Sequence, residues 1–238
     1  MARSRQRPQV QLRLPPGDIG AVAVVLHGGK GRSHRAPQPW QAAVVRMAPI
    51  ARAISRAGAP HGVAVATVLH RYRGWNGPEM SPVADARCAL DIVRERCGDV
   101  PVVLVGHSMG GRTALHCADD PNVIGVVALA PWIEPGEPIA QLAGRQLVVL
   151  HGDRDRWTDP RASRVYVEQA ATFTRAARIE MVGEGHSMLR RASLWHALAA
   201  GSVLAELGFT PQSDSGPDAN TAQEALHRVA AGHVLLSV

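Results

Sequence analysis

Short runs rich in apolar residues, some of them uninterrupted, alternate with amphipathic stretches along most of the chain. The runs of strand length cover residues 21–26, 62–69, 101–105, 123–129, 146–150 and 177–182. Between them, apolar residues recur at helical spacing, as at Val83, Ala86, Leu90 and Val93. A continuous apolar run predicts a strand that is buried on both faces, and strands separated by helices predict a mostly parallel, doubly wound α/β sheet with helices on both faces.

Both ends of the chain depart from this pattern. Residues 9–14 alternate between polar and apolar side chains, which predicts an edge strand within an N-terminal extension of residues 1–20. Residues 21–209 form the predicted α/β domain. Residues 210–220 are rich in Pro, Ser, Asp and Gly, which is typical of a linker, and a short amphipathic helix is predicted after them. We expect residues 210–238 either to dock on the domain or to be disordered, and the composition favours disorder.

One predicted strand ends at the pentapeptide Gly106-His107-Ser108-Met109-Gly110, and a helical stretch follows it. A serine on a sharp strand-to-helix turn has a strained backbone, so side chains two residues before and after it would clash. The two glycines remove those side chains. The pattern predicts a nucleophilic Ser108 at a helix N-terminus, with the Met109 N–H directed at an oxyanion. The alternative is a glycine-rich turn with an incidental serine.

Three acidic residues follow the predicted strand 146–150. A serine nucleophile needs a histidine base that a carboxylate orients, and the order serine, acid, histidine is expected with this turn. Asp159 precedes Pro160 and is better explained as a helix N-cap. Of the other two, we favour Asp155 as the triad acid and Asp153 as a residue that forms the turn or supports the site from outside.

His186 is the predicted base. It follows the last predicted strand in a glycine-flanked loop, and it comes after the serine and the acid in the chain. His116 and His196 lie in predicted helices, whereas His27 and His151 end strands and are expected to shape loops. The order of the motifs therefore favours a Ser108, Asp155 and His186 triad.

The second oxyanion donor is predicted where the first buried strand ends, at His27-Gly28-Gly29. This turn lies at the same predicted edge of the sheet as Ser108. Glycines allow the backbone N–H to turn inward, so we assign the donor to Gly29, with Gly28 and Lys30 as alternatives.

Three tryptophans, Trp75, Trp132 and Trp157, each follow a predicted strand near the same edge. Only 4% of the residues are aromatic, so this grouping predicts the apolar wall of a substrate pocket. For each tryptophan taken alone, a role as a loop anchor explains its position equally well.

Over residues 22–207 these motifs together resemble the α/β-hydrolase superfamily, and small bacterial α/β-fold serine hydrolases in particular. The resemblance implies an α/β-hydrolase fold with Ser108, Asp155 and His186 as the catalytic residues, and Gly29 and Met109 as the oxyanion donors. In many relatives the acid is the third residue after the glycine that ends this strand, which supports Asp155.

Two departures from the family pattern change the expected site. Only residues 1–20 precede the first buried strand, so the usual antiparallel N-terminal strands are expected to be reduced. Only residues 132–145 separate the two strands that often flank a cap domain. This segment is too short for a large cap domain, so we expect an open site suited to small or medium acyl groups.

Charge, hydropathy and cysteine content indicate which partners and which cellular compartment to expect. The net charge is +6, but the arginines are spread along the chain and no aromatic residues interleave with a basic run, so we expect no nucleic-acid partner. No apolar run reaches the roughly 18 residues of a membrane helix, and residues 1–8 lead into no signal-peptide core. Cys88, Cys97 and Cys117 lack metal-ligand spacing and are typical of a reducing cytoplasm.

The sequence therefore predicts a cytoplasmic serine hydrolase that cleaves a small-molecule ester or thioester through an acyl-enzyme intermediate. We expect it to need neither a metal nor an organic cofactor. An acyltransferase with the same triad, and a ligand-binding member of the fold without turnover, are the alternatives. The sequence does not indicate an oligomeric state.

Overall fold

A computed structural model describes residues 7–210 and 216–238. Its strands are β1 (Gln9–Arg13), β2 (Ala21–Leu26), β3 (Val63–Leu69), β4 (Val102–His107), β5 (Val123–Leu129), β6 (Gln146–Gly152), β7 (Arg175–Met181) and β8 (Leu235–Ser237). The helices are α1 (Ala42–Val45), α2 (Met47–Gly58), α3 (Ser81–Cys97), α4 (Met109–His116), α5 (Pro160–Ala170), α6 (Ala192–Glu206) and α7 (Pro217–Ala230).

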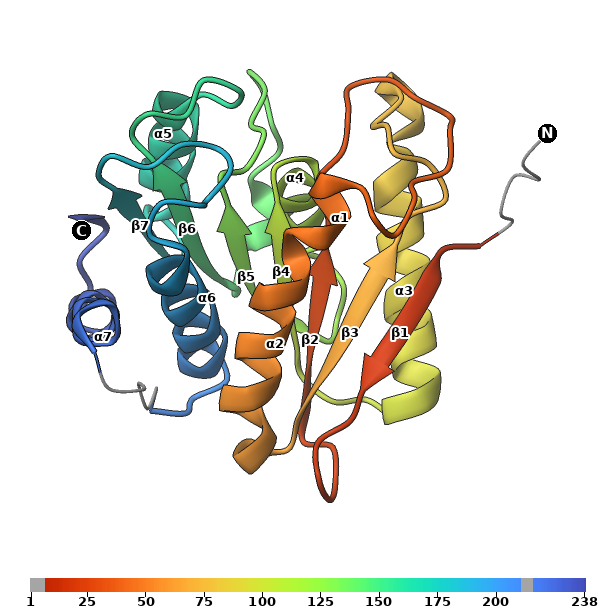
Figure 1. Cartoon of the computed structure of the whole chain (residues 1–238), viewed down its shortest axis with the longest axis horizontal. Helices are drawn as coiled ribbons and strands as arrows, with labels where there is room; N and C mark the ends of the chain where they lie inside the picture. The colour runs from red at the N-terminus through yellow and green to blue at the C-terminus, as the bar shows by residue number, and fades with distance from the viewer. Residues whose placement is uncertain (1–6, 211–215) are drawn as a thin grey trace.

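Within these residues the strands form one sheet of eight, in the order β1-β3-β2-β4-β5-β6-β7-β8. Strand β1 runs antiparallel to β3, and every other pairing is parallel. Helices α2 and α6 cover one face of the sheet, and α3, α4 and α5 cover the other (Figure 1). The predicted doubly wound α/β architecture is confirmed.

The continuous apolar runs have a direct structural reason. In β2, Ala21, Ala23 and Val25 belong to the core on the α2 and α6 side, while the residues between them belong to the core under α3 and α4. Because side chains of a strand alternate between faces, a strand with helices on both faces needs apolar residues at every position. All six residues of β2 are buried.

The C-terminal segment differs from the expected disorder. Helix α7 packs against α6, and β8 extends the sheet by pairing in parallel with β7. Ala222, Ala225, Leu226 and Leu236 are buried in this arrangement, which compensates for the entropy of ordering the tail. Of the residues predicted as a linker, 211–215 lie outside the described residues, and 217–220 belong to α7.

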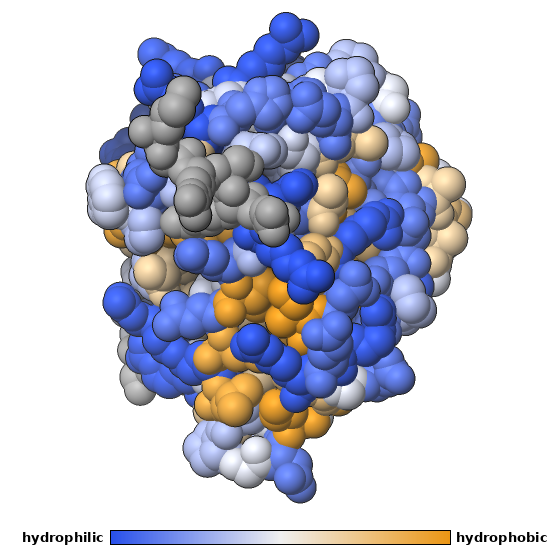
Figure 2. All heavy atoms as spheres, turned by 90° about the vertical axis from the view of Figure 1, so that its right-hand side faces the viewer, coloured by the Kyte–Doolittle hydropathy of each residue, from blue (hydrophilic) through white to orange (hydrophobic). Residues whose placement is uncertain are grey.

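Within the described residues, only one antiparallel strand, β1, precedes the first buried strand, as expected. Strand β1 carries exposed Gln9, Gln11 and Arg13 alternating with half-buried Val10 and Leu12. Figure 2 faces this side of the molecule, and its surface is mostly hydrophilic around one hydrophobic area. Residues 1–6 of the predicted extension lie outside the described residues. Polar side chains on an edge strand disfavour pairing with a second sheet.

The segment between β5 and β6, where relatives often carry a cap domain, contains only one short helical turn, Ala140–Leu142. The expected absence of a large cap domain is therefore confirmed. Among the described residues, no helix is both long and apolar enough to cross a membrane.

Glu206, near the end of α6, provides a test of stability. Its carboxyl group is buried against Gly125 of β5, and neither oxygen has a hydrogen-bond partner. Burial raises the pKa of Glu206 well above its usual value. Above the pKa of an unfolded glutamate, the folded chain therefore holds a proton that the unfolded chain releases. The free energy of unfolding therefore falls as the pH rises from the pKa of an unfolded glutamate toward the raised pKa of Glu206 in the folded chain.

We therefore expect Glu206→Gln, which cannot ionise, to raise the Tm by at least about 2 °C at pH 8, since each kcal/mol shifts the Tm of a domain of this size by about 2–4 °C. The gain should shrink at pH 5. Differential scanning fluorimetry at both pH values checks this result. An equal gain at both would show that the ionisation of Glu206 is not its cause.

Candidate active site

Ser108 is the single residue between β4 and α4, and its backbone is strained. Its φ of 54° and ψ of −116° lie in a region that residues with side chains rarely adopt. A Cβ atom on Gly106 would overlap the Gly110 carbonyl group, and one on Gly110 would overlap the carbonyl group of Leu26. Both glycines are therefore sterically required: Gly106 for the close approach within the turn that the pentapeptide suggested, and Gly110 because the neighbouring strand β2 packs against it.

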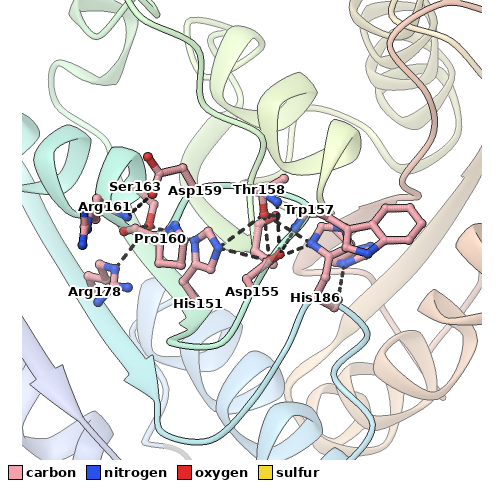
Figure 3. A network of polar contacts seen from close by, with 12 residues as sticks. His151, Asp155, Trp157, Thr158, Asp159, Pro160, Arg161, Ser163, Arg178 and His186 are labelled. Atoms are coloured by element: carbon pink, nitrogen blue, oxygen red, sulfur yellow. Dashed lines mark hydrogen bonds and ion pairs between the residues drawn. The ribbon is translucent and has the colours of Figure 1, made fainter.

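A hydrogen bond between Asp155 and His186 lies at the centre of the polar network in Figure 3, with His186 Nδ1 2.7 Å from Asp155 Oδ2. The other carboxylate oxygen accepts the backbone N–H groups of Trp157 at 2.7 Å and Thr158 at 3.0 Å. Burial would raise the pKa of Asp155, but hydrogen bonds from His151, from His186 and from these N–H groups outweigh it and hold the pKa far below its usual range. The carboxylate therefore stays ionised beside His186.

His151 is a second imidazole on the same carboxylate. Its Nε2 lies 3.2 Å from Asp155 Oδ2, and its Nδ1 lies 2.8 Å from the Ser163 hydroxyl. Arg178 donates to that hydroxyl at 3.2 Å, so the network reaches from β7 to the carboxylate (Figure 3). We expected His151 only to shape a loop. Its place at the end of a predicted strand, four residues before Asp155, was the available signal.

The two rejected acids lie in the positions expected for local structure. Asp153 accepts the Gly183 N–H at 2.6 Å in an exposed turn. Asp159 caps α5 by accepting the Arg161 N–H at 2.8 Å. Of the three acids, Asp155 alone is hydrogen-bonded to His186 within the described residues.

His107, the residue before the serine, supports the His186 loop. Its Nε2 donates to the His186 carbonyl at 3.0 Å, and the two rings lie 4.7 Å apart. Burial, with the nearby His186, lowers the pKa of His107 to about 3, so the ring is neutral. No hydrogen bond among the described residues joins the Ser108 hydroxyl to His186, a contact that is often long before substrate binds.

The predicted oxyanion loop follows β2 and passes beside the serine. A Cβ atom on Gly28 would lie 3.4 Å from Ser108 Cβ. The Lys30 N–H donates to the Arg73 carbonyl at 2.7 Å, which removes Lys30 as a donor. Within the described chain, the Gly29 N–H donates no hydrogen bond to another protein group. Gly29 therefore keeps a donor available, whereas Lys30 does not.

His27 stabilises this loop through two hydrogen bonds. Its Nδ1 donates to the Gly28 carbonyl at 2.7 Å, and its Nε2 accepts the His70 N–H at 3.2 Å. Burial is the main cause that lowers the pKa of His27 to about 3, which keeps the ring neutral and able to do both. His27 thus shapes the loop, as expected.

The three tryptophans do not form one wall. Trp75 and Trp132 line a cleft of about 510 Å³ beside α4. Trp157 is 86% exposed and stacks on His186, with the rings 5.8 Å apart and nearly parallel (Figure 3). Trp157 therefore covers the His186 ring. Of the three tryptophans, only Trp75 and Trp132 line the cleft.

The described residues contain no cluster of three or more His, Cys, Asp or Glu side chains with the geometry of a metal site. The site as described offers a serine, a histidine and a carboxylate.

The sequence model of the alpha/beta hydrolase family matches residues 23–236, which includes every residue of the site and all of strand β8 except Ser237. The chain belongs to the alpha/beta hydrolase family. No curated protein matches it.

Solved structures support the same fold for this alpha/beta hydrolase. An α/β serine hydrolase without a lid from Xanthomonas campestris is 19% identical with a TM-score of 0.61, and the match covers 87% of this chain and 91% of that one. Est1E from Butyrivibrio proteoclasticus with bound ferulic acid is 13% identical with a TM-score of 0.63, covering 84% and 96%. Esterase 2 from Thermogutta terrifontis with bound propionate is 16% identical with a TM-score of 0.63, covering 87% and 92%.

Proposed function

We propose that this alpha/beta hydrolase cleaves an ester or thioester of a small or medium acyl group through an acyl-enzyme intermediate. The observation that supports it most is the ionised, fully hydrogen-bonded Asp155 carboxylate, which orients His186 at the sheet edge that carries the strained Ser108. The esterase structures similar in fold are consistent with this class of substrate.

In the proposed reaction, His186 Nε2 takes the proton of the Ser108 hydroxyl as its oxygen attacks the substrate carbonyl carbon. The N–H groups of Gly29 and Met109 donate to the oxyanion. Protonated His186, stabilised by Asp155, then donates its proton to the leaving alcohol or thiol. A water molecule, deprotonated by the same imidazole, attacks the acyl carbon. The bond from that carbon to the Ser108 oxygen then breaks, protonated His186 returns the proton to this oxygen, and the acid is released.

The lack of a large cap domain supports a small substrate, and the free cysteines support a reducing compartment. Without a cap, little protein is available to enclose a long acyl chain, which supports a small-molecule substrate. Cys88, Cys97 and Cys117 are all free thiols, which supports a reducing compartment such as the cytoplasm. No nucleic acid or membrane partner forms part of the proposal.

Labelling with a fluorophosphonate probe tests the proposed nucleophile. We expect strong labelling of the wild type and none of Ser108→Ala or His186→Ala, because the probe reacts only with an activated serine. Ser55→Ala, on α2, serves as the matched control and should label like the wild type. Wild-type protein with a normal circular dichroism spectrum and no labelling would contradict the proposal.

A further inference from the structure

The cleft beside α4 holds an arginine whose position the proposed reaction does not explain. The Arg112 guanidinium carbon lies 4.2 Å from the Trp75 ring centroid and 4.6 Å from that of Trp132. Arg112 also lines the cleft of about 510 Å³. Cation–π contacts to two indole rings hold the guanidinium group in one place.

Glu137 fixes the orientation of this group through one nitrogen only. Arg112 Nε lies 2.9 Å from a carboxylate oxygen of Glu137, whose side chain is 1% exposed. Glu137 also accepts from His116 and from the Glu134 N–H. Burial would raise the pKa of Glu137, but its hydrogen bonds with His116 and Arg112 outweigh burial and lower the pKa. The carboxylate is thus ionised and already supplied with donors.

The two terminal nitrogens of Arg112 remain available. Neither forms a hydrogen bond with another described residue, and neither is sealed from solvent. These two nitrogens form the edge of a guanidinium group that binds a carboxylate through two parallel hydrogen bonds. Arg32 and Glu134 also line the cleft, and their opposite charges offset each other. The feature that favours a carboxylate is therefore the free edge of the Arg112 guanidinium group, not an excess of positive charge.

Two residues that line the cleft contact the backbone of the proposed nucleophile. Arg112 lies one helical turn after Ser108, and both its N–H and that of Trp132 donate to the Ser108 carbonyl, at 3.1 and 3.2 Å. Gly31, two residues after the proposed donor Gly29, also lines the cleft. A substrate bound at Ser108 would reach Arg112 by extending along these residues.

We infer that Arg112 determines substrate specificity by binding a carboxylate on the substrate, so that the physiological substrate is an ester or thioester that carries a second, free acid group. The inference rests on the proposed function. The carboxylate belongs either to the acyl part, as in a half-ester of a dicarboxylic acid, or to the leaving alcohol. Trp75 and Trp132 would contact the part of the substrate that joins the two groups.

Matched substrate pairs test the inference. On the acyl side, monoethyl succinate, glutarate and adipate are compared with ethyl butyrate, pentanoate and hexanoate. On the leaving-group side, 4-(butyryloxy)benzoate is compared with phenyl butyrate. We expect the wild type to prefer at least one acid over its neutral partner by about 10- to 100-fold in kcat/KM, the range for hydrogen bonds to a charged group.

Arg112→Lys and Arg112→Met should abolish that preference through a higher KM for the acid member of the pair. Arg164→Gln, on the exposed face of α5, is the control for loss of one positive charge and should leave the preference unchanged. A wild type without preference for any acid overturns the inference, as do Arg112 variants that slow both members of a pair equally.

Binding separates this inference from the proposed function. Calorimetry with Ser108→Ala, which cannot form the acyl-enzyme, should show tighter binding of the preferred acid than of its neutral partner, and no such difference once Arg112→Met is added. Failed fluorophosphonate labelling with selective binding would overturn only the hydrolase proposal. Normal labelling with unselective binding would overturn only the role of Arg112.

Discussion

Asp155→Asn is expected to lower kcat/KM for 4-nitrophenyl butyrate by about 10⁴-fold, the loss typical of a triad carboxylate changed to its amide. One oxygen of Asp155 accepts two backbone N–H groups, and the other faces His186, His151 and the Thr158 hydroxyl. Whichever way the amide is turned, its NH₂ group meets donors instead of acceptors. His186 then loses both its orientation and the stabilisation of its protonated form.

Asp153→Asn is the matched control for this change. Asp153 lies two residues away on the same loop, is exposed and accepts only the Gly183 N–H. Its amide keeps an oxygen for that bond, so activity should stay within about threefold of the wild type. Steady-state kinetics of both variants, with Tm values to confirm folding, measure the difference. Equal losses would contradict the role of Asp155.

Gly110→Ala is expected to destabilise the fold around the site strongly. The added methyl group would overlap the backbone of Leu26 and His27, and backbone cannot move aside as a flexible side chain can. Overpacking of this kind costs about 3 kcal/mol or more. In a domain of this size the Tm should fall by about 6–12 °C, with loss of fluorophosphonate labelling.

Gly20→Ala provides the comparison, because the nearest atom to its added Cβ would be the His61 carbonyl oxygen at 3.8 Å. Its Tm should stay within about 2 °C of the wild type, and labelling should be unchanged. Thermal unfolding and labelling of both variants check the prediction. A Gly110→Ala variant that keeps its Tm and its labelling would show that α4 can shift away from β2.

Several elements were predictable because their signals are local. A run such as Val123–Leu129 is apolar at every position, and the observed β5 has those same bounds. The strain at Ser108 and the need for Gly106, whose added Cβ would meet the Gly110 carbonyl group, arise within five residues, so the pentapeptide alone indicates them. The need for Gly110 comes from the backbone of Leu26 and His27, which only the tertiary structure brings next to it. The absence of a large cap followed from the length of one segment.

Other features were not predictable because they join residues that are distant in the sequence. The position of Trp157 over His186 depends on where the loops after β6 and β7 meet. The contact of Arg112 with Trp75 and Trp132 needs one helix and two loops from separate strands. The docking of β8 on β7 depends on a free sheet edge, which a composition window cannot detect.

By itself, the sequence determined the alternation of strands and helices, the strained serine turn and the order of serine, acid and histidine. These follow from side-chain periodicity, backbone sterics and chain order, which are properties of neighbouring residues. The tertiary structure alone decided that Asp155 meets both His151 and His186, and that Arg112 lies between two indole rings. Hydrogen bonds and cation–π contacts act over a few ångströms, so their partners are set by the packing of strands and loops rather than by the local pattern.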